Sequence, residues 1–137
     1  MLPDADFHHI GIACRSFDVE QRKLEMLGYA RESEDFYDPL QRVHVRFLTG
    51  GGPRLELVRG DGQQGPLSPW LKSGVKMYHM AYEVAALDTA ISNLGEGGAK
   101  LLVPPVPAVA FAGRRISFLM LPNMLLVELI EKQHVTE

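Results

Sequence analysis

The sequence predicts an α+β domain that contains two copies of one plan, a strand followed by a helix and then by further strands. The observation behind this prediction is a repeat. His79 lies 70 residues after His9 (79 − 9), and Glu128 lies 72 residues after Glu56 (128 − 56). The separation from histidine to glutamate is 47 residues in the first half (56 − 9) and 49 in the second (128 − 79). A chain of 137 residues is long enough for one domain with a sizeable core.

In the first half, the apolar run at residues 7–14 is the first expected strand. A helix should follow, capped by Ser16 or Asp18 and ending near Gly28, because serine and aspartate are preferred helix starts and glycine a preferred end. The side chains expected on its buried side are Leu24 and Leu27.

The second half repeats this pattern. The strand is expected at residues 78–84, and a helix should begin at Asp88 or a neighbour and end in the glycine cluster at residues 95–98. Apolar residues recur there at helical spacing, namely Leu87, Ile91 and Leu94.

Two further strands are expected in each half, at residues 43–48 and 54–58 and at residues 116–121 and 125–130. Turns rich in glycine, proline and asparagine separate the members of each pair, as a hairpin requires. We therefore place module one at about 5–60, a linker at about 61–76 and module two at about 77–132 of a single domain.

Two segments fall outside the repeat. Glycine and proline dominate the linker, where Trp70 and Leu71 are expected to begin a short helical turn. The prolines at positions 104, 105 and 107 should hold residues 103–107 extended, because proline fixes its own φ and restricts its predecessor. We predict a rim loop there.

The composition limits the classes of function. With 46% apolar and 23% charged residues, the sequence is typical of a soluble globular protein. A net charge of −3 offers no basic surface for nucleic acid, and no apolar run approaches the ~20 residues of a membrane span. The single cysteine, Cys14, excludes an internal disulfide and suits a reducing compartment, where it is expected to be a packed small residue. We expect a cytoplasmic protein whose partner is a small molecule or a second copy of the chain in a homodimer, with no nucleic-acid or membrane partner.

The duplicated histidines and glutamates lie in apolar surroundings. Because side chains alternate along a strand, Glu128 shares its face with Leu126 and Ile130, and the opposite face is apolar too. An ionised carboxylate there needs a metal, a basic partner or a proton to offset its desolvation. A metal also accounts for the histidines, and mixed nitrogen and oxygen ligands suit zinc, nickel, cobalt, iron or manganese. We predict one divalent ion held by four ligands: His9, Glu56, His79 and Glu128.

Taken singly, each of these residues has a simpler interpretation. A lone histidine in a strand is usually a hydrogen-bonded side chain, and a lone glutamate usually faces water. The matched recurrence in both halves favours a shared site, although a duplicated copy that had lost its metal would show the same pattern.

Short motifs along most of the chain carry a resemblance: HIGIA at 9–13, LELV at 55–58, SPWL at 68–71, YHMAYEV at 78–84, RISFL at 115–119 and VELI at 127–130. They resemble the vicinal oxygen chelate superfamily, which includes glyoxalase I, methylmalonyl-CoA epimerase, extradiol dioxygenases and bleomycin-type resistance proteins, and look most like its epimerase-related glyoxalase branch. The resemblance implies two βαβββ modules that form a cupped, barrel-like mixed sheet around a central cavity with the metal inside.

The resemblance also implies a type of chemistry. Its members chelate two neighbouring substrate oxygens, and the metal stabilises the enolate that forms when a carboxylate removes an α-proton. A ligand glutamate can be that base in the glyoxalases, so Glu56 and Glu128 are the candidate catalytic residues. This implies a metal-dependent isomerase, epimerase or lyase acting on a small carbonyl or acyl-thioester substrate.

Two positions depart from the named activities. The epimerases have a catalytic glutamate where this sequence has Leu40, and glyoxalase I usually has an arginine where this sequence has Ala13. Asp35 and Asp38 lie near Leu40 and are candidate replacements, although each also fits as a turn residue.

Two other classes of function stay open. One is a binding protein that sequesters a small molecule, which the full set of ligands disfavours. The other is an iron dioxygenase, which the extra carboxylate of Glu56 disfavours. Three basic side chains are candidates for holding a substrate carboxylate or phosphate, or else simply face solvent: Arg115, His44 and Arg46.

Overall fold

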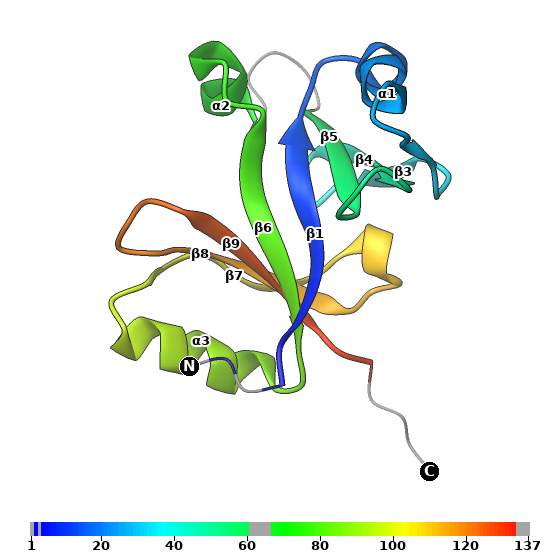
Figure 1. Cartoon of the computed structure of the whole chain (residues 1–137). Helices are drawn as coiled ribbons and strands as arrows, with labels where there is room; N and C mark the ends of the chain where they lie inside the picture. Colours follow the sequence, from blue (N-terminus) through cyan, green and yellow to red (C-terminus); the bar gives the residue numbers. More distant parts are fainter. Residues whose placement is uncertain (1, 3, 61–66, 134–137) are drawn as a thin grey trace. The chain divides into compact units, whose positions relative to one another are not determined.

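The computed structural model describes residues 2, 4–60 and 67–133, which form two compact units (Figure 1). The N-terminal unit comprises His9–Tyr78, and the C-terminal unit comprises Met1–His8 together with His79–Glu137. Each unit contains a mixed sheet and a helix that packs on it. This confirms the predicted α+β class and the repeated order of strand, helix and further strands.

The N-terminal unit follows the predicted order and adds two short strands. The strand order is β2-β4-β5-β1, and β3 also pairs with β4, at residues 43–45, whereas β2 pairs at residues 48–49. β1 and β5 are parallel, and the remaining pairs are antiparallel. The elements are β1 (Asp6–Ala13), α1 (Phe17–Glu25), β2 (Ala30–Arg31), β3 (Phe36–Asp38), β4 (Val43–Thr49), β5 (Leu55–Gly60) and α2 (Ser68–Ser73).

The predicted residues Ser16 and Gly28 mark the start of helix α1 and the turn that follows its end. The Ser16 hydroxyl accepts a hydrogen bond from the backbone N–H of Val19 at 3.3 Å, and Gly28 turns the chain with a φ of 95°. The prediction that Leu24 and Leu27 are both buried was wrong for Leu27, which is 65% exposed. The helix ends at Glu25, so Leu27 lies beyond it and no longer follows the helical spacing.

One core cluster lies between α1 and the sheet of the N-terminal unit. Cys14 is part of this cluster, which confirms that it is a packed small residue. The buried members come from β1 and the residue after it, from α1 and the segment after it, and from β4 and β5: Ile12, Cys14, Phe17, Tyr29, Leu48, Leu55 and Leu57.

The C-terminal unit has the βαβββ order, which adds one strand directly after the helix to the two that were predicted there. Its strand order is β6-β9-β8-β7, with β6 and β9 parallel and the other pairs antiparallel. Helix α3 lies along one face of this sheet (Figure 1). The predicted apolar residues of α3 all pack in the second core cluster. The elements are β6 (Met77–Val84), α3 (Leu87–Glu96), β7 (Lys100–Pro107), a 3-10 turn (Val109–Phe111), β8 (Arg115–Met120) and β9 (Leu126–Glu131).

The rim loop predicted at residues 103–107 is instead part of strand β7. The extended backbone was anticipated, but the pairing with β8 was not. In its sheet β7 is an edge strand with shifts in register at Leu101/Val103 and Val103/Val106. Prolines are tolerated there because an edge strand and a bulge do not require every N–H to donate to a neighbour.

The predicted linker contains helix α2, which confirms a helical turn at Trp70 and Leu71. Residues 61–66 of that linker lie outside the described residues. Among the helices that the structure describes, we found none with the length and apolar character to cross a membrane.

Candidate metal centre

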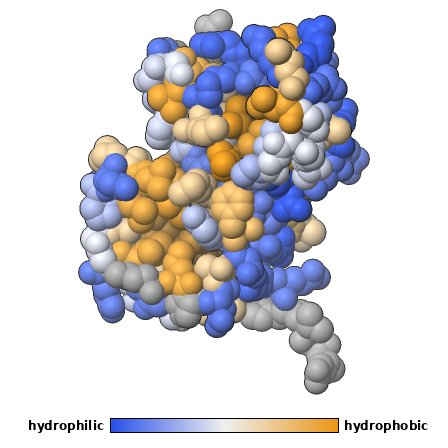
Figure 2. All heavy atoms as spheres, in the orientation of Figure 1, coloured by the Kyte–Doolittle hydropathy of each residue, from blue (hydrophilic) through white to orange (hydrophobic). Residues whose placement is uncertain are grey.

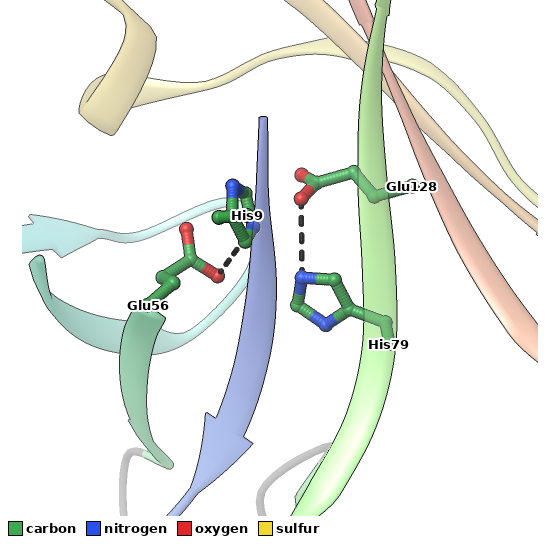
Figure 3. Close-up of side chains that lie close together, drawn as sticks. All are labelled: His9, Glu56, His79 and Glu128. Carbon is green, nitrogen blue, oxygen red and sulfur yellow. Dashed lines mark ion pairs between the residues drawn. The ribbon is translucent and has the colours of Figure 1, made fainter. Parts of the chain in front are cut away.

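His9 and Glu56 form a buried pair in the N-terminal unit. The parallel register of β1 and β5 sets Gly11 opposite Glu56, so His9, two residues before Gly11, shares that face. His9 Nε2 lies 3.4 Å from Glu56 Oε1, and their side chains are only 0% and 6% exposed (Figure 3). A nitrogen and a carboxylate oxygen are thus held together away from water.

The C-terminal unit repeats this pair with His79 and Glu128. Here Ala81 lies opposite Glu128 in the parallel register of β6 and β9, and His79 again comes two residues earlier. His79 Nε2 lies 3.3 Å from Glu128 Oε1, with side chains 0% and 3% exposed (Figure 3). The repeat in the sequence therefore corresponds to a repeat of register, distance and burial.

Each pair also has a phenylalanine that the sequence analysis missed. Phe47 lies opposite Glu56 in register, and its ring meets the His9 ring edge to face at 5.6 Å between centroids. Phe118 lies opposite Glu128 and meets the His79 ring in the same way at 5.3 Å. The signal was available, because the two residues are 71 apart (118 − 47) in corresponding strands.

The donor atoms of each pair fit a divalent ion. Two donors bound ~2.1 Å from one tetrahedral ion lie about 3.4 Å apart, by simple geometry from typical bond lengths. The nitrogen–oxygen separations of 3.3 and 3.4 Å agree with that spacing. Imidazole with carboxylate is a common ligand combination for zinc, iron, cobalt, nickel and manganese. A bound cation would also offset the cost of burying each carboxylate.

Arg46 and His44, two of the predicted substrate-binding residues, face away from Glu56. Strand β4 sets Phe47 opposite Glu56, so the adjacent Arg46 points to the other side of the sheet, as does His44. The His44 ring lies 4.7 Å from the ring of Tyr37. The structure does not bring these residues to the His9–Glu56 pair, and their substrate-binding role stays a prediction.

The Arg46 guanidinium is engaged by carboxylates within the N-terminal unit. It donates to both carboxylate oxygens of Asp35, at 2.7 and 3.0 Å, and to Asp18 at 3.0 Å. These bonds hold the pKa of Asp35 below its ordinary value and raise the pKa of Arg46. Asp35 is therefore occupied in an ion pair.

Arg115, the third predicted substrate-binding residue, is paired in a similar way. It donates to the two carboxylate oxygens of Glu131 at 3.1 and 2.7 Å and to Asp88 at 3.3 Å. Phe118 comes three positions after Arg115, and side chains at an odd offset lie on opposite faces of β8. Its role in substrate binding likewise stays a prediction.

Leu40 lies in the turn between β3 and β4 and is 66% exposed. The neighbouring Asp38 is buried, and its carboxylate accepts hydrogen bonds from the backbone N–H groups of Leu40 and Gln41 and from the Gln41 side chain. These contacts favour the turn interpretation of Asp38 over a catalytic one.

Comparison with known proteins places the chain in a family. The model of the Glyoxalase/Bleomycin resistance protein/Dioxygenase superfamily matches residues 8–118. The chain belongs to this superfamily. The resemblance to the vicinal oxygen chelate proteins, drawn from the short motifs, is thereby confirmed. No curated protein sequence matches the chain.

Solved structures agree with this membership. A hypothetical protein from Bacillus halodurans C-125 is similar, with 26% identity, a TM-score of 0.79, and coverage of 98% of this chain and 99% of that one. Methylmalonyl-CoA epimerase from Streptomyces coelicolor, in complex with 2-nitronate-propionyl-CoA, shares 25% identity with a TM-score of 0.75, over 96% and 97% of the two chains. The Mycobacterium tuberculosis epimerase shares the fold at 21% identity, with a TM-score of 0.76 over 93% and 88%.

Proposed function

We propose that the protein is a divalent-metal-dependent epimerase, isomerase or lyase that acts on a small carbonyl or acyl-thioester substrate through an enolate. The observation that carries the proposal is the pair of buried imidazole–carboxylate contacts, repeated with the same register and spacing. Membership of the superfamily and the similarity to methylmalonyl-CoA epimerases support the same type of chemistry.

The proposal assigns four ligands to one ion: His9, Glu56, His79 and Glu128, all of them buried. It also makes the two modules parts of one domain, as the sequence analysis predicts. When bound, a divalent ion supplies a Lewis acid that polarises a substrate carbonyl. Two carboxylates from the chain would balance the charge of a divalent cation, while the imidazoles contribute neutral nitrogen donors.

Glu56 or Glu128 is the proposed base. Its carboxylate oxygen takes the α-proton, the electrons of the broken C–H bond move toward the carbonyl oxygen, and the protonated glutamate returns the proton to carbon. Leu40 has no group that can accept a proton, and Asp35 and Asp38 are bound to Arg46 and to turn N–H groups. A ligand glutamate is then the best-placed candidate that remains.

Metal stoichiometry tests the shared site. Elemental analysis of protein purified without added metal should give one divalent ion per chain, and His9→Ala and His79→Ala should each lose it. His44→Ala removes a histidine that faces away from Glu56, so it should retain the ion. Two ions per chain, each lost in only one of the variants, would contradict a shared site.

Hydrogen exchange tests the chemistry. Metal-loaded protein should catalyse exchange of the α-proton of a 2-oxo or acyl-thioester compound in deuterated water, as followed by NMR. Glu56→Gln or Glu128→Gln, whichever is the base, should slow exchange by about 100-fold or more. Glu131→Gln removes a carboxylate on the opposite face of β9 and serves as the control. Failure of every such compound to exchange would count against the proposal.

One observation favours a second candidate, a small-molecule-binding protein without catalysis. It is Leu40, which stands where the epimerases have their catalytic glutamate. Tight stoichiometric binding of a drug-like compound by metal-free protein, without any exchange activity, would support this candidate. Activity that disappears under anaerobic conditions would instead revive the iron dioxygenase.

A further inference from the structure

Phe47 and Phe118 occupy equivalent places beside the two histidine–glutamate pairs. Each lies directly across from the glutamate of its pair in an antiparallel register, and its ring meets the ring of the histidine. The interplanar angles are 73° for His9 with Phe47 and 86° for His79 with Phe118. Register, ring separation and ring orientation are therefore all repeated in the two units.

These phenylalanines do not belong to either of the core clusters described above. Their sequence neighbours Leu48 and Leu119 point to the other face of the same strands and pack there, in the clusters under α1 and α3. Phe47 and Phe118 are members of neither cluster. Their rings lie on the faces that carry the histidine and glutamate side chains.

A neighbouring aromatic ring can help to fix the ring plane of a histidine ligand. The torsion that turns the imidazole about its bond to Cβ has broad minima, so the backbone alone leaves the direction of Nε2 loosely defined. An edge-to-face aromatic contact favours one relative orientation of the two rings, because the electropositive edge of one ring meets the electronegative face of the other. It thus limits the rotation that would move Nε2 away from the glutamate oxygen.

We infer that Phe47 and Phe118 are positioning residues that orient His9 and His79 for metal binding. This inference rests on the proposed function, because it assigns the two rings a task at the proposed ligands. Each phenylalanine acts through its histidine and contributes no donor atom of its own. Each phenylalanine also lies across from the glutamate of its pair. The histidine and the glutamate of a pair therefore have the same phenylalanine as a neighbour.

Substitution of Phe118 is the cleaner test, because this side chain is only half-buried whereas Phe47 is buried. Titration of metal-free protein with Co²⁺, followed by the visible absorption of the bound ion, should show that Phe118→Leu weakens binding roughly three- to tenfold and alters the spectrum. Phe118→Tyr keeps an aromatic ring and should restore wild-type affinity. Leu119→Ala, which removes a buried side chain on the opposite face, should bind Co²⁺ as the wild type does.

A second measurement separates this inference from the proposed function. In metal-free wild-type protein, the His79 ring protons should show NMR shifts and contacts caused by the Phe118 ring, and Phe118→Leu should abolish the shifts and leave the imidazole in more than one orientation. Wild-type protein that binds no divalent ion would overturn the proposed function. Binding by wild type with unchanged Co²⁺ affinity in Phe118→Leu, or an equal loss in Leu119→Ala, would overturn the positioning role alone.

Discussion

The carboxylate partners of Arg46 determine what this residue contributes to the stability of the fold. Its guanidinium is buried between Asp35 and Asp18 and lies 5.1 Å from the centre of the Phe17 ring. Because the hydrogen bond from Arg46 lowers the pKa of Asp35 below 3.8, the ion pair stabilises the fold above that pH. The stabilisation is lost as the pH falls through the lowered value, because the folded protein must then take up a proton.

Replacement of Arg46 tests a structural role against the predicted role in substrate binding. Arg46→Met should lower the free energy of unfolding at pH 7 by ~1–3 kcal/mol, a modest loss because Asp18 and Asp35 are largely or partly exposed to solvent. Urea unfolding should show that the difference shrinks as the pH falls below 3.8. Metal content should not change. Wild-type stability with lost substrate binding would favour the role in substrate binding.

Cys14 gives a second prediction at this scale. Burial raises the pKa of its thiol from 9.0 to about 11, so at pH 8 only about one folded molecule in a thousand carries the thiolate. Iodoacetamide should therefore modify Cys14 very slowly in the native protein and rapidly after unfolding in urea. Rapid native modification would show that the thiol is accessible.

The same shift in pKa predicts how stability depends on pH. Between pH 9.0 and about 11 the unfolded chain loses the Cys14 proton while the folded chain keeps it, so the free energy of unfolding falls as the pH rises. The total loss is about 3 kcal/mol, because each pH unit between the two pKa values is worth ~1.36 kcal/mol. Cys14→Ala removes this group, so its stability should decrease less across this range than that of the wild type in urea titrations at each pH.

At the scale of elements, the two repeated helices differ at their first residue. Helix α1 has Ser16 as its N-cap, whereas α3 begins after Ala86, which has an extended backbone and no side-chain hydrogen bond to the helix. Ala86 is exposed, so a polar side chain fits there without disturbing the core. The two corresponding helices thus differ in N-capping: α1 has a side-chain cap and α3 has none.

A serine at position 86 should supply the missing cap. We expect Ala86→Ser to raise the free energy of unfolding by ~0.5–1 kcal/mol and Ser16→Ala to lower it by a similar amount, because the hydroxyl satisfies an N–H group of the first turn. Denaturant unfolding measures both. Ala85→Ser, one position before the cap, should have little effect; an equal gain there would argue against capping.

At the scale of the whole molecule, the proposed ion would stabilise the fold. Free metal at about 100 times its dissociation constant should add ~2.7 kcal/mol, which for a chain of this length raises Tm by roughly 10 °C. Thermal unfolding with and without a chelator measures this shift, and His79→Ala should show none. An equal shift in His79→Ala would indicate binding elsewhere.

Exposed apolar side chains are the surface feature that is relevant to a homodimer. Exposed apolar side chains include Leu101, Leu102 and Met124 of the C-terminal unit, and Figure 2 shows apolar areas among polar ones on one face. The homodimer and the cytoplasmic location stay predictions. Sedimentation of the 15.2 kDa chain would show whether a dimer forms.

Much of the fold was predictable because it depends on local patterns. Apolar runs bounded by turn residues located the principal strands, helical spacing located the helices, and Ser16 and Gly28 located the ends of α1. The misses have a common cause. Leu27 and the edge strand β7 depend on where a helix stops and which strand lies alongside, and neither is encoded in the pattern of a short segment.

The sequence by itself determined the duplicated plan, the α+β class and the four candidate ligands, because repetition at closely similar spacing is visible without coordinates. Only the tertiary structure decided the register that sets each histidine beside its glutamate, the phenylalanine that touches each imidazole, and the ion pairs of Arg46 and Arg115. The physical reason is that strand pairing joins residues distant in the chain. A shift of one residue in register would move a side chain to the opposite face of its sheet.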